Sequence, residues 1–335
     1  MEITDVSTEE WDRALPTTGF EVFHTPTALD VVDRHTPGER RLFVGYKGDN
    51  PVAMFPVFVV ERAVGQAVLS PPPGMGIPQL GPLLMPASPK RRKRERLNRE
   101  FVETVLERVG VDGRASLCRV VCSPAYPDPR PFAWTGMDVG TEFTYTLDTA
   151  ERSPEELLRD ASKSLRREVG DGRETDVQVT VEGAEAARLV YDQTSERYAE
   201  QGESYPLAKA YVADLTAALA EVGRCRVYVA RDPDGEFLSG ITVLYSNDAA
   251  YFWQGGTRAT YDGVSINSLL HWHIVEDLAS ETPQGATAYD LLGANTERLC
   301  RYKSKFGGRL EPYHVVESGG TTMDIAKRAY QLVGR

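Results

Sequence analysis

The chain has 335 residues, 41% of them hydrophobic, which is enough for about two domains with a substantial core. Acidic residues outnumber basic ones 49 to 38, and the formal charge of −11 argues against nucleic-acid binding through a global basic field. No apolar run approaches the roughly 18 residues of a membrane span, and the acidic N-terminus does not resemble a signal peptide. We therefore expect a soluble, cytoplasmic protein.

The four cysteines give no metal or disulfide pattern. Cys118, Cys122, Cys225 and Cys300 are scattered, and the chain has no Cys-x-x-Cys and only five histidines. Such spacing predicts buried, reduced thiols and no metal site.

The first half of the chain begins with helical patterns at 11–15 and 27–32. Three alternating strands follow over 41–70, with a polar turn at 48–50. A Pro/Gly-rich stretch then leads to a basic helix near 88–109 and a strand over 115–122.

The second half repeats this order. Helical patterns at 184–201 and 207–219 precede three strands over 226–256, with a turn at 232–235, then a helix over 266–278 and a strand over 287–292. A weak repeat of this kind predicts two similar α/β domains. We place the boundary between residues 148 and 149, because Ser153 and the proline after it are typical of a helix start.

Several catalytic signatures are absent. The chain has no Gly-x-Ser-x-Gly, no His-Glu-x-x-His, no Walker loop and no dinucleotide fingerprint after a strand. The glycines and prolines of 71–82 do not form such a motif.

The richest stretch runs from 249 to 314. A strand ending in Gly255 and Gly256 leads through a polar loop into a helix, which can present free N–H groups to a phosphate, although an ordinary strand–helix connection reads the same way. His271 and His273 lie two residues apart on that helix, so they cannot share a metal, and one of them is a candidate proton carrier. The next motif contains Lys303, a compact charge suited to a phosphate or an oxyanion.

These segments resemble the FemAB-like branch of the GNAT acyltransferase superfamily. The matching residues are SKSLRREV at 162–169, YFWQGG at 251–256, SINSLLHW at 265–272, YDLLGA at 289–294 and YKSKFGG at 302–308. The resemblance implies an α/β (α+β) fold of two tandem GNAT-like domains, each a mixed, mostly antiparallel sheet flanked by helices. It assigns 1–148 to the acceptor and 149–335 to donor binding and catalysis.

The resemblance also implies acyl transfer to an amine of a small molecule, glycan or peptide, with acetyl-CoA or another acyl-CoA as co-substrate and no permanently bound cofactor. Lys303 matches the family lysine that contacts the donor or the oxyanion, and Asp290 and His271 are our candidates for proton handling. The remaining candidates would bind the donor: Tyr251, Trp253 and Gln254 on the strand, Gly263, Val264, Ser265 and Ile266 at the helix start, and the basic pair Arg166 and Arg167, which a solvated helix face explains as well.

Two alternatives stay open. An aminoacyl-tRNA could be the donor, as in relatives that extend a peptidoglycan bridge, although the region between Tyr198 and Arg224 has no room for their basic helical arm. The chain could also be a degenerate GNAT pair that binds without turnover, since 257–265 lacks the usual pyrophosphate motif. The basic run at 90–96 fits tRNA, a phosphorylated acceptor, an anionic membrane or a solvated helix start paired with acids.

Overall fold

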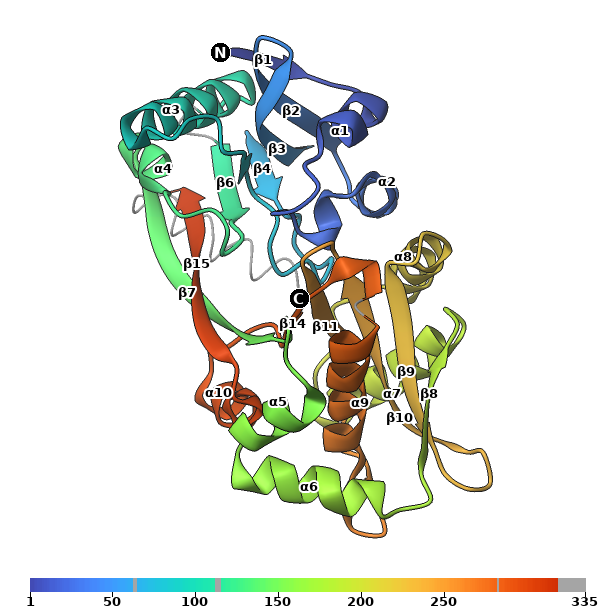
Figure 1. The fold of residues 1–335 in the computed structure, drawn as a ribbon. Helices are drawn as coiled ribbons and strands as arrows, with labels where there is room; N and C mark the ends of the chain where they lie inside the picture. Colours follow the sequence, from blue (N-terminus) through green and yellow to red (C-terminus); the bar gives the residue numbers. More distant parts are fainter. Residues whose placement is uncertain (63–64, 112–115, 282, 319–335) are drawn as a thin grey trace.

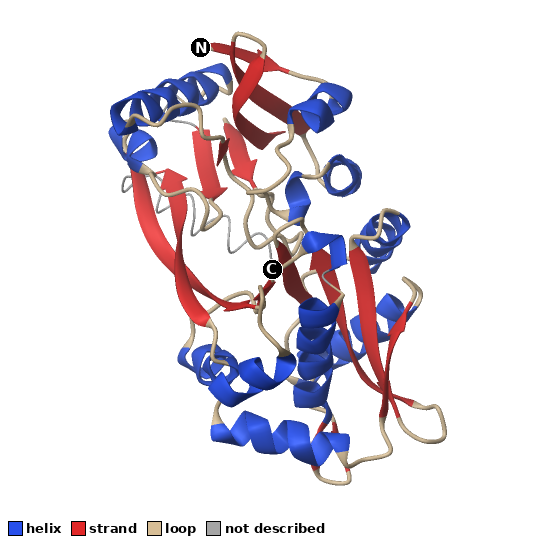
Figure 2. Ribbon diagram, in the orientation of Figure 1, coloured by secondary structure: helices blue, strands red, loops and turns tan. Residues whose placement is uncertain are grey.

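The computed structural model describes residues 1–62, 65–111, 116–281 and 283–318. Helices and strands pack around one long, twisted sheet that runs through both halves of the molecule (Figures 1 and 2). Its strand order is β1-β2-β3-β4-β6-β15-β7-β14-β11-β10-β9-β8, with β5 paired to β3.

The N-terminal half contains β1 (Glu2–Asp5), α1 (Thr8–Ala14), η1 (Val22–His24), α2 (Pro26–His35), β2 (Glu39–Lys47), β3 (Asn50–Glu61), β4 (Gln66–Ser70), β5 (Leu83–Leu84), α3 (Arg91–Arg108), β6 (Ser116–Val121), α4 (Arg130–Trp134) and β7 (Met137–Asp148). The C-terminal half contains α5 (Pro154–Asp160), α6 (Lys163–Arg173), β8 (Gln178–Glu182), α7 (Ala186–Glu200), α8 (Lys209–Glu221), β9 (Cys225–Arg231), β10 (Phe237–Tyr245), β11 (Ala249–Gly255), β12 (Thr260–Tyr261), β13 (Val264–Ser265), α9 (Ile266–Ser280), η2 (Pro283–Gly285), β14 (Ala288–Asp290), α10 (Glu297–Lys303), η3 (Ser304–Phe306) and β15 (Arg309–Ser318).

The predicted repeat is confirmed in its element order. Each half has two helices, an antiparallel three-stranded meander, a further helix and then a strand parallel to the last strand of the meander. The helix start at Ser153 is also confirmed: its side chain accepts a hydrogen bond from the Glu156 amide, and the Ser153 amide donates one to the Glu156 carboxylate.

The last strands of the two halves cross over between them, which the sequence did not reveal. β7 pairs with β15 along their whole length and also with β14 of the C-terminal half, while β15 pairs with β6 of the N-terminal half. Figure 1 shows β7 and β15 running side by side as a ribbon that connects the two ends of the molecule. The predicted boundary at 148/149 falls at the end of β7, a strand hydrogen-bonded on both sides to the other half.

A shared hydrophobic core also joins the halves. Trp11, Phe23 and Val32 belong to the same buried cluster as Tyr211 and Leu215. Helices α2 and α8 contact each other there, and the ring Nε2 of His35 lies 2.8 Å from a carboxylate oxygen of Asp214. Burial of several large side chains, at roughly 2 kcal/mol each, makes this interface part of the fold.

Among the described residues all four cysteines are free thiols, and three of them, Cys118, Cys122 and Cys225, are buried, as predicted. The same part of the chain contains no cluster of potential metal ligands. None of its helices combines the length and apolar character needed to cross a membrane.

Gly255, at the end of β11, should not tolerate a side chain. Its φ is +99°, and an added Cβ would lie 2.2 Å from the carbonyl oxygen of Gly240 on β10. We expect Gly255→Ala to lower the free energy of unfolding by about 4 kcal/mol, because backbone strain and a backbone clash add together. Gly263→Ala is the control: φ is +80° there but no atom lies within 4 Å, so a loss of about 1 kcal/mol is expected in chemical denaturation. Equal losses would contradict the clash.

Candidate functional site

The candidate site lies where two parallel strands of the C-terminal half separate. β11 and β14 pair only from Ala249↔Ala288 to Tyr251↔Asp290. Beyond that point β11 stays with β10, whereas the chain after β14 turns to β7, with the Leu291 amide donating to the Tyr145 carbonyl at 2.9 Å. We call this opening the fork. Separation of two parallel strands exposes backbone polar groups to a ligand.

The equivalent opening in the N-terminal half is filled by the chain itself. β4 and β6 pair in parallel up to Ser70↔Val120. The segment after β4 then takes the vacated place: the Leu80 amide donates to the Val121 carbonyl at 2.9 Å, and β5 pairs with β3. The fork of the C-terminal half is therefore the one with strand edges available to a substrate.

A glutamate from the N-terminal half reaches this fork. The loop before η1 is fastened to the β10–β11 turn, because the Gly19 amide donates to Asp248 at 2.7 Å. This contact places Glu21 beside β11, where the Tyr251 hydroxyl donates a hydrogen bond to its carboxylate. Burial raises the pKa of Glu21 to about 7. The nearby charge of Asp290 also raises this pKa, whereas the hydrogen bond from Tyr251 lowers it.

Asp290 ends β14 opposite Tyr251. It is 4% exposed, and it accepts hydrogen bonds from the Thr144 hydroxyl and, at 2.8 Å, from the Leu292 amide. Burial raises its pKa to about 6, although both hydrogen bonds and the charge of Lys303 act in the other direction. Two carboxyl groups with raised pKa values, from opposite halves of the chain, thus meet at the fork. A pair of this kind can hold or accept a proton near neutral pH.

An open cleft of about 650 Å³ leads to this pair. Four carboxyl groups line it: Glu21, Asp248, Asp290 and Glu311. Arg309 also lines it, and its guanidinium is bound to Glu311. The net charge of the walls is therefore strongly negative, which favours a cationic ligand such as a protonated amine.

Lys303 lies against the segment that follows β14, and it does not line the cleft. It is 6% exposed, and its ammonium donates to the carbonyl oxygens of Leu292 and, at 2.9 Å, Gly293. Leu292 has a φ of +50°, a left-handed conformation that is strained for a branched side chain. Lys303 thus holds a strained turn directly after Asp290, and burial lowers its pKa to about 8.

The structure does not bring His271 into the cleft. His271 is fully buried among Phe252, Tyr302 and Phe306, and its Nδ1 lies 2.8 Å from the Tyr289 hydroxyl. Burial lowers its pKa to about 3, so the ring is neutral at physiological pH. Its environment is that of a histidine packed in the core, outside the residues that line the cleft. His273, by contrast, is partly exposed and 3.5 Å from Glu276.

The candidate strand residues take different directions from β11. Tyr251 faces the cleft, whereas the indole N–H of Trp253 donates to the Gly76 carbonyl at 2.9 Å. This contact brings the Pro/Gly-rich loop of the N-terminal half against the C-terminal half. Gln254 donates to the Tyr205 hydroxyl at 3.0 Å, and its buried Oε1 has no partner among the described residues.

The predicted phosphate cradle contains a carboxylate. Gly263, Val264 and Ser265 form the second half of the small β12–β13 hairpin, and Ile266 begins α9. In the first turn of α9, the Ser268 hydroxyl donates to Glu168 of α6 at 2.6 Å.

Residues of α6 and η3 complete this arrangement. The other oxygen of Glu168 accepts from Lys305 at 3.1 Å. Arg166 donates to the carbonyls of Arg159 and Ala161, so it caps α5, while Arg167 is exposed beside Asp171. The α6 helix therefore presents Glu168 to the start of α9, whereas Arg166 is held at the end of α5 and Arg167 lies on an exposed helix face.

Comparison with known proteins bears on the fold of the chain. Residues 158–304 match the acetyltransferase (GNAT) domain family. A search of curated proteins by sequence finds no match.

Solved structures resemble the whole chain. FemX is 11% identical, with 100% of both chains covered and a TM-score of 0.70. A tandem GNAT protein from the clavulanic acid biosynthesis pathway is 14% identical, with 96% and 99% covered and a TM-score of 0.50. L-PGS from Bacillus licheniformis is 12% identical, with 92% and 97% covered and a TM-score of 0.54.

The fold expected from the sequence is thus confirmed: the chain has a tandem GNAT fold like that of FemX and of the clavulanic acid pathway protein, and residues 158–304 match the GNAT domain family.

Proposed function

We propose that the protein is an N-acyltransferase that moves an acyl group from an activated ester or thioester to the amino group of a cationic acceptor. The observation that carries this proposal is the pair Glu21 and Asp290, which meets at the open fork and ends an acidic cleft. The cleft attracts an ammonium group, and a carboxylate at its end can take the proton that makes the nitrogen nucleophilic.

The reaction balances with these groups. The amine nitrogen attacks the acyl carbonyl carbon, so a C–N bond forms and the C–O or C–S bond of the donor breaks. Glu21 accepts one proton from the nitrogen, and the departing oxygen or sulfur takes one proton. Holding both reactants in the fork contributes through proximity, with the carboxyl pair supplying general-base catalysis of about 100-fold or more.

For the donor, we place an aminoacyl ester, such as an aminoacyl-tRNA, ahead of acyl-CoA. Glu168 lies at the start of α9, where the sequence predicted a cradle for the pyrophosphate of CoA. The carboxylate repels a phosphate and also binds the charge of Lys305, so this site offers a phosphate no net positive charge. An aminoacyl group also carries an ammonium of its own, which the acidic walls favour, whereas an acetyl group is uncharged. The strand–loop–helix order from β11 to α9 keeps acyl-CoA as the second candidate.

The direct test is an acyl-transfer assay with aminoacyl-tRNA and acetyl-CoA as parallel donors and a series of mono- and diamines as acceptors. We expect product formation with the aminoacyl donor and a preference for acceptors with more than one positive charge. Transfer from acetyl-CoA alone would reverse the order of the two donors. Absence of transfer from both, with binding of either one, would support the non-catalytic alternative.

Glu168→Gln tests the reason given for that order. We expect the affinity for acetyl-CoA, measured by calorimetry, to rise about fivefold, because one repulsive charge leaves the start of α9. Asp171→Asn, on the same helix α6 but beside Arg167, serves as the matched control and should change the affinity little. If wild type and Glu168→Gln bind acetyl-CoA equally well, repulsion by Glu168 is not the cause, and acyl-CoA regains first place.

A further inference from the structure

A second cavity, of about 730 Å³, lies in the N-terminal half and is not part of the acyl-transfer cleft. Its walls are the segment after β5, the first two turns of α3 and the loop between β6 and α4. Ala125 lines both this cavity and the cleft, so the two adjoin. The volume is in the range of pockets that hold small organic ligands, about 300–1,000 Å³.

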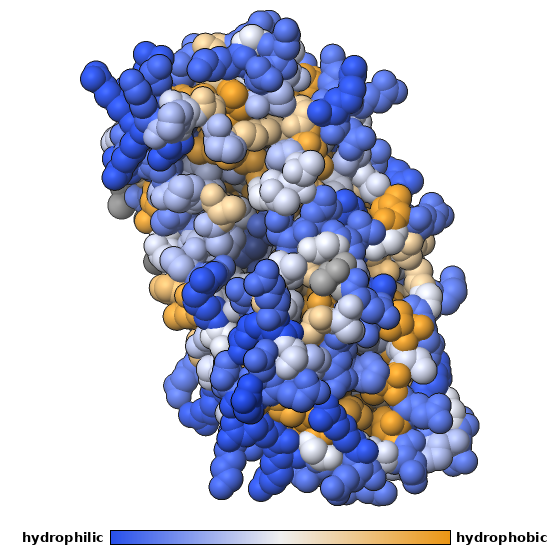
Figure 3. All heavy atoms as spheres, in the orientation of Figure 1, coloured by the Kyte–Doolittle hydropathy of each residue, from blue (hydrophilic) through white to orange (hydrophobic). Residues whose placement is uncertain are grey.

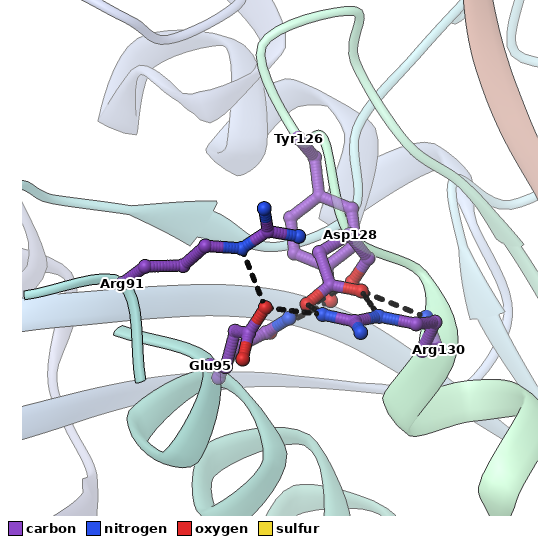
Figure 4. Close-up of polar contacts among 6 residues, drawn as sticks. Arg91, Glu95, Tyr126, Asp128 and Arg130 are labelled. Atoms are coloured by element: carbon purple, nitrogen blue, oxygen red, sulfur yellow. Dashed lines mark hydrogen bonds and ion pairs between the residues drawn. The ribbon is translucent and has the colours of Figure 1, made fainter. Parts of the chain in front are cut away.

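Two carboxylates hold two guanidinium groups on the wall of this cavity (Figure 4). Arg130 donates to Asp128 at 2.6 and 2.8 Å and to Glu95 at 2.8 Å. Arg91 donates to Glu95 through its Nε at 2.9 Å, which leaves both of its terminal nitrogens without an acceptor among the described residues. Hydrogen bonds from Arg130 lower the pKa of both Glu95 and Asp128, so these two carboxylates stay charged near neutral pH.

A buried amide keeps the wall rigid. Asn98 of α3 is 1% exposed, accepts from the Tyr126 hydroxyl at 2.8 Å and donates to the Asp128 carbonyl at 2.8 Å. These two bonds fasten the loop before α4 to the helix. The positions of Asp128 and Arg130 are therefore set before any ligand arrives, which reduces the entropic cost of binding.

The positive charge around the cavity is not neutralised. Residues 90–96 hold six basic residues and one acid. Of the six, Arg91 alone has an ion pair within the described ranges; Arg94 donates to the carbonyls of Ser88 and Pro89 instead. The chain has a net charge of −11, yet within the described ranges the other five basic residues of 90–96 have no ion pair with an acid. The run is therefore not explained as a solvated surface neutralised by acids.

The basic run also opposes the helix that it begins. α3 has no acid in its first turn and no side-chain cap at Lys90, so its positive dipole end meets further positive charge. Figure 3 shows strongly hydrophilic side chains extending over α3 at the upper left of the molecule. A bound anion would relieve this repulsion.

We propose that the cavity binds a phosphate ester, with its phosphate on Arg91 and Arg94 and its carbon part against Leu84, Met85 and Leu97. Guanidinium groups match phosphate oxygens in pairs, and the apolar wall suits a ligand that is more than an inorganic ion. The volume of about 730 Å³ suits a small molecule or a single lipid headgroup better than an extended nucleic acid. This inference does not rest on the proposed acyl transfer.

The test is calorimetric titration of the full chain with ADP, a phosphate ester with a flat apolar part, at low and high salt. We expect binding that weakens as salt rises, and a loss of at least tenfold in the double variant Arg91→Gln/Arg94→Gln. Ala87→Phe, which fills the cavity and keeps every charge, should weaken ADP to the same degree. Arg99→Gln is the matched control, since Arg99 lies on the same helix, pairs with Glu103 and is outside the cavity.

A second arm distinguishes the source of the phosphate. Three results together would show that the ligand is a lipid headgroup in this cavity. Vesicles of phosphatidylglycerol would bind the protein, ADP would compete with that binding, and Ala87→Phe would weaken it. If ADP alone binds with the expected pattern, the ligand is a free phosphorylated compound. Failure of both probes, an equal loss in Arg99→Gln, or no loss in Ala87→Phe would overturn the proposal. Circular dichroism confirms that each variant is folded.

Discussion

Replacing Glu21 by glutamine should lower kcat for amine acylation about 100-fold while leaving the protein folded. The carboxylate of Glu21 is the group proposed to accept the proton of the attacking nitrogen, and glutamine cannot accept it. The amide keeps the size of the side chain and can still accept the hydrogen bond from Tyr251. Steady-state kinetics with the active donor measure the change.

The pH dependence of the rate tests the same role for Glu21. With a pKa of about 7, Glu21 is protonated in acid, so the wild-type rate should fall as pH drops below about 7. Because Asp290 is close and titrates near 6, the observed limb belongs to the pair rather than to one residue. Glu21→Gln should remove the limb near pH 7. A variant that keeps both the limb and the rate would show that Glu21 is not the base.

Glu21→Gln should lower kcat but should not lower the stability of the folded protein at alkaline pH. The pKa of Glu21 is raised in the folded state, so its contribution to stability is full below its ordinary value of 4.5 and is lost as pH rises through about 7. At pH 8 the glutamine variant should therefore have a Tm equal to or above that of wild type. Glu311→Gln, in the same cleft but bound to Arg309, is the control and should affect mainly KM.

Local patterns predicted most of the elements but not the way the halves meet. The hairpins with turns at 48–50 and 232–235, the helix start at Ser153 and the motif with Lys303 all depend on neighbours in sequence. Glu21 had no such signal, since it lies 230 residues from Tyr251 and gains its raised pKa only through burial beside β11. The crossing of β7 and β15 was hidden for the same reason: strand patterns predict a strand but not its partner.

For His271 and Arg166, the sequence patterns indicated candidate functional residues, and the structure shows where each side chain lies. A histidine in a mostly apolar helix and a base near the boundary both have ordinary structural uses, and the structure gives them those uses: one is packed among aromatic rings, and the other caps α5. Only the three-dimensional position separates these outcomes, because the chemistry of the side chain is the same in both.

Lys303→Met should lower kcat at least tenfold and should also lower the free energy of unfolding by about 1–3 kcal/mol. Methionine keeps the length of the side chain but leaves the carbonyls of Leu292 and Gly293 without their donor. The strained turn at Leu292 then loses what holds it, and Asp290, two residues earlier, loses its position. Lys305→Met is the matched control: Lys305 pairs with Glu168 away from the turn, so kcat should change less than threefold.

The pH profile separates this role from mere loss of stability. Burial lowers the pKa of Lys303 to about 8, so the ammonium is lost above that pH and the wild-type rate should fall there, giving a bell between the limbs near 7 and 8. Arginine stays charged at these pH values, so Lys303→Arg should flatten the alkaline limb whatever its effect on the maximum rate. An alkaline limb unchanged in Lys303→Arg, or a full rate in Lys303→Met, would mean that the charge of Lys303 does not position Asp290.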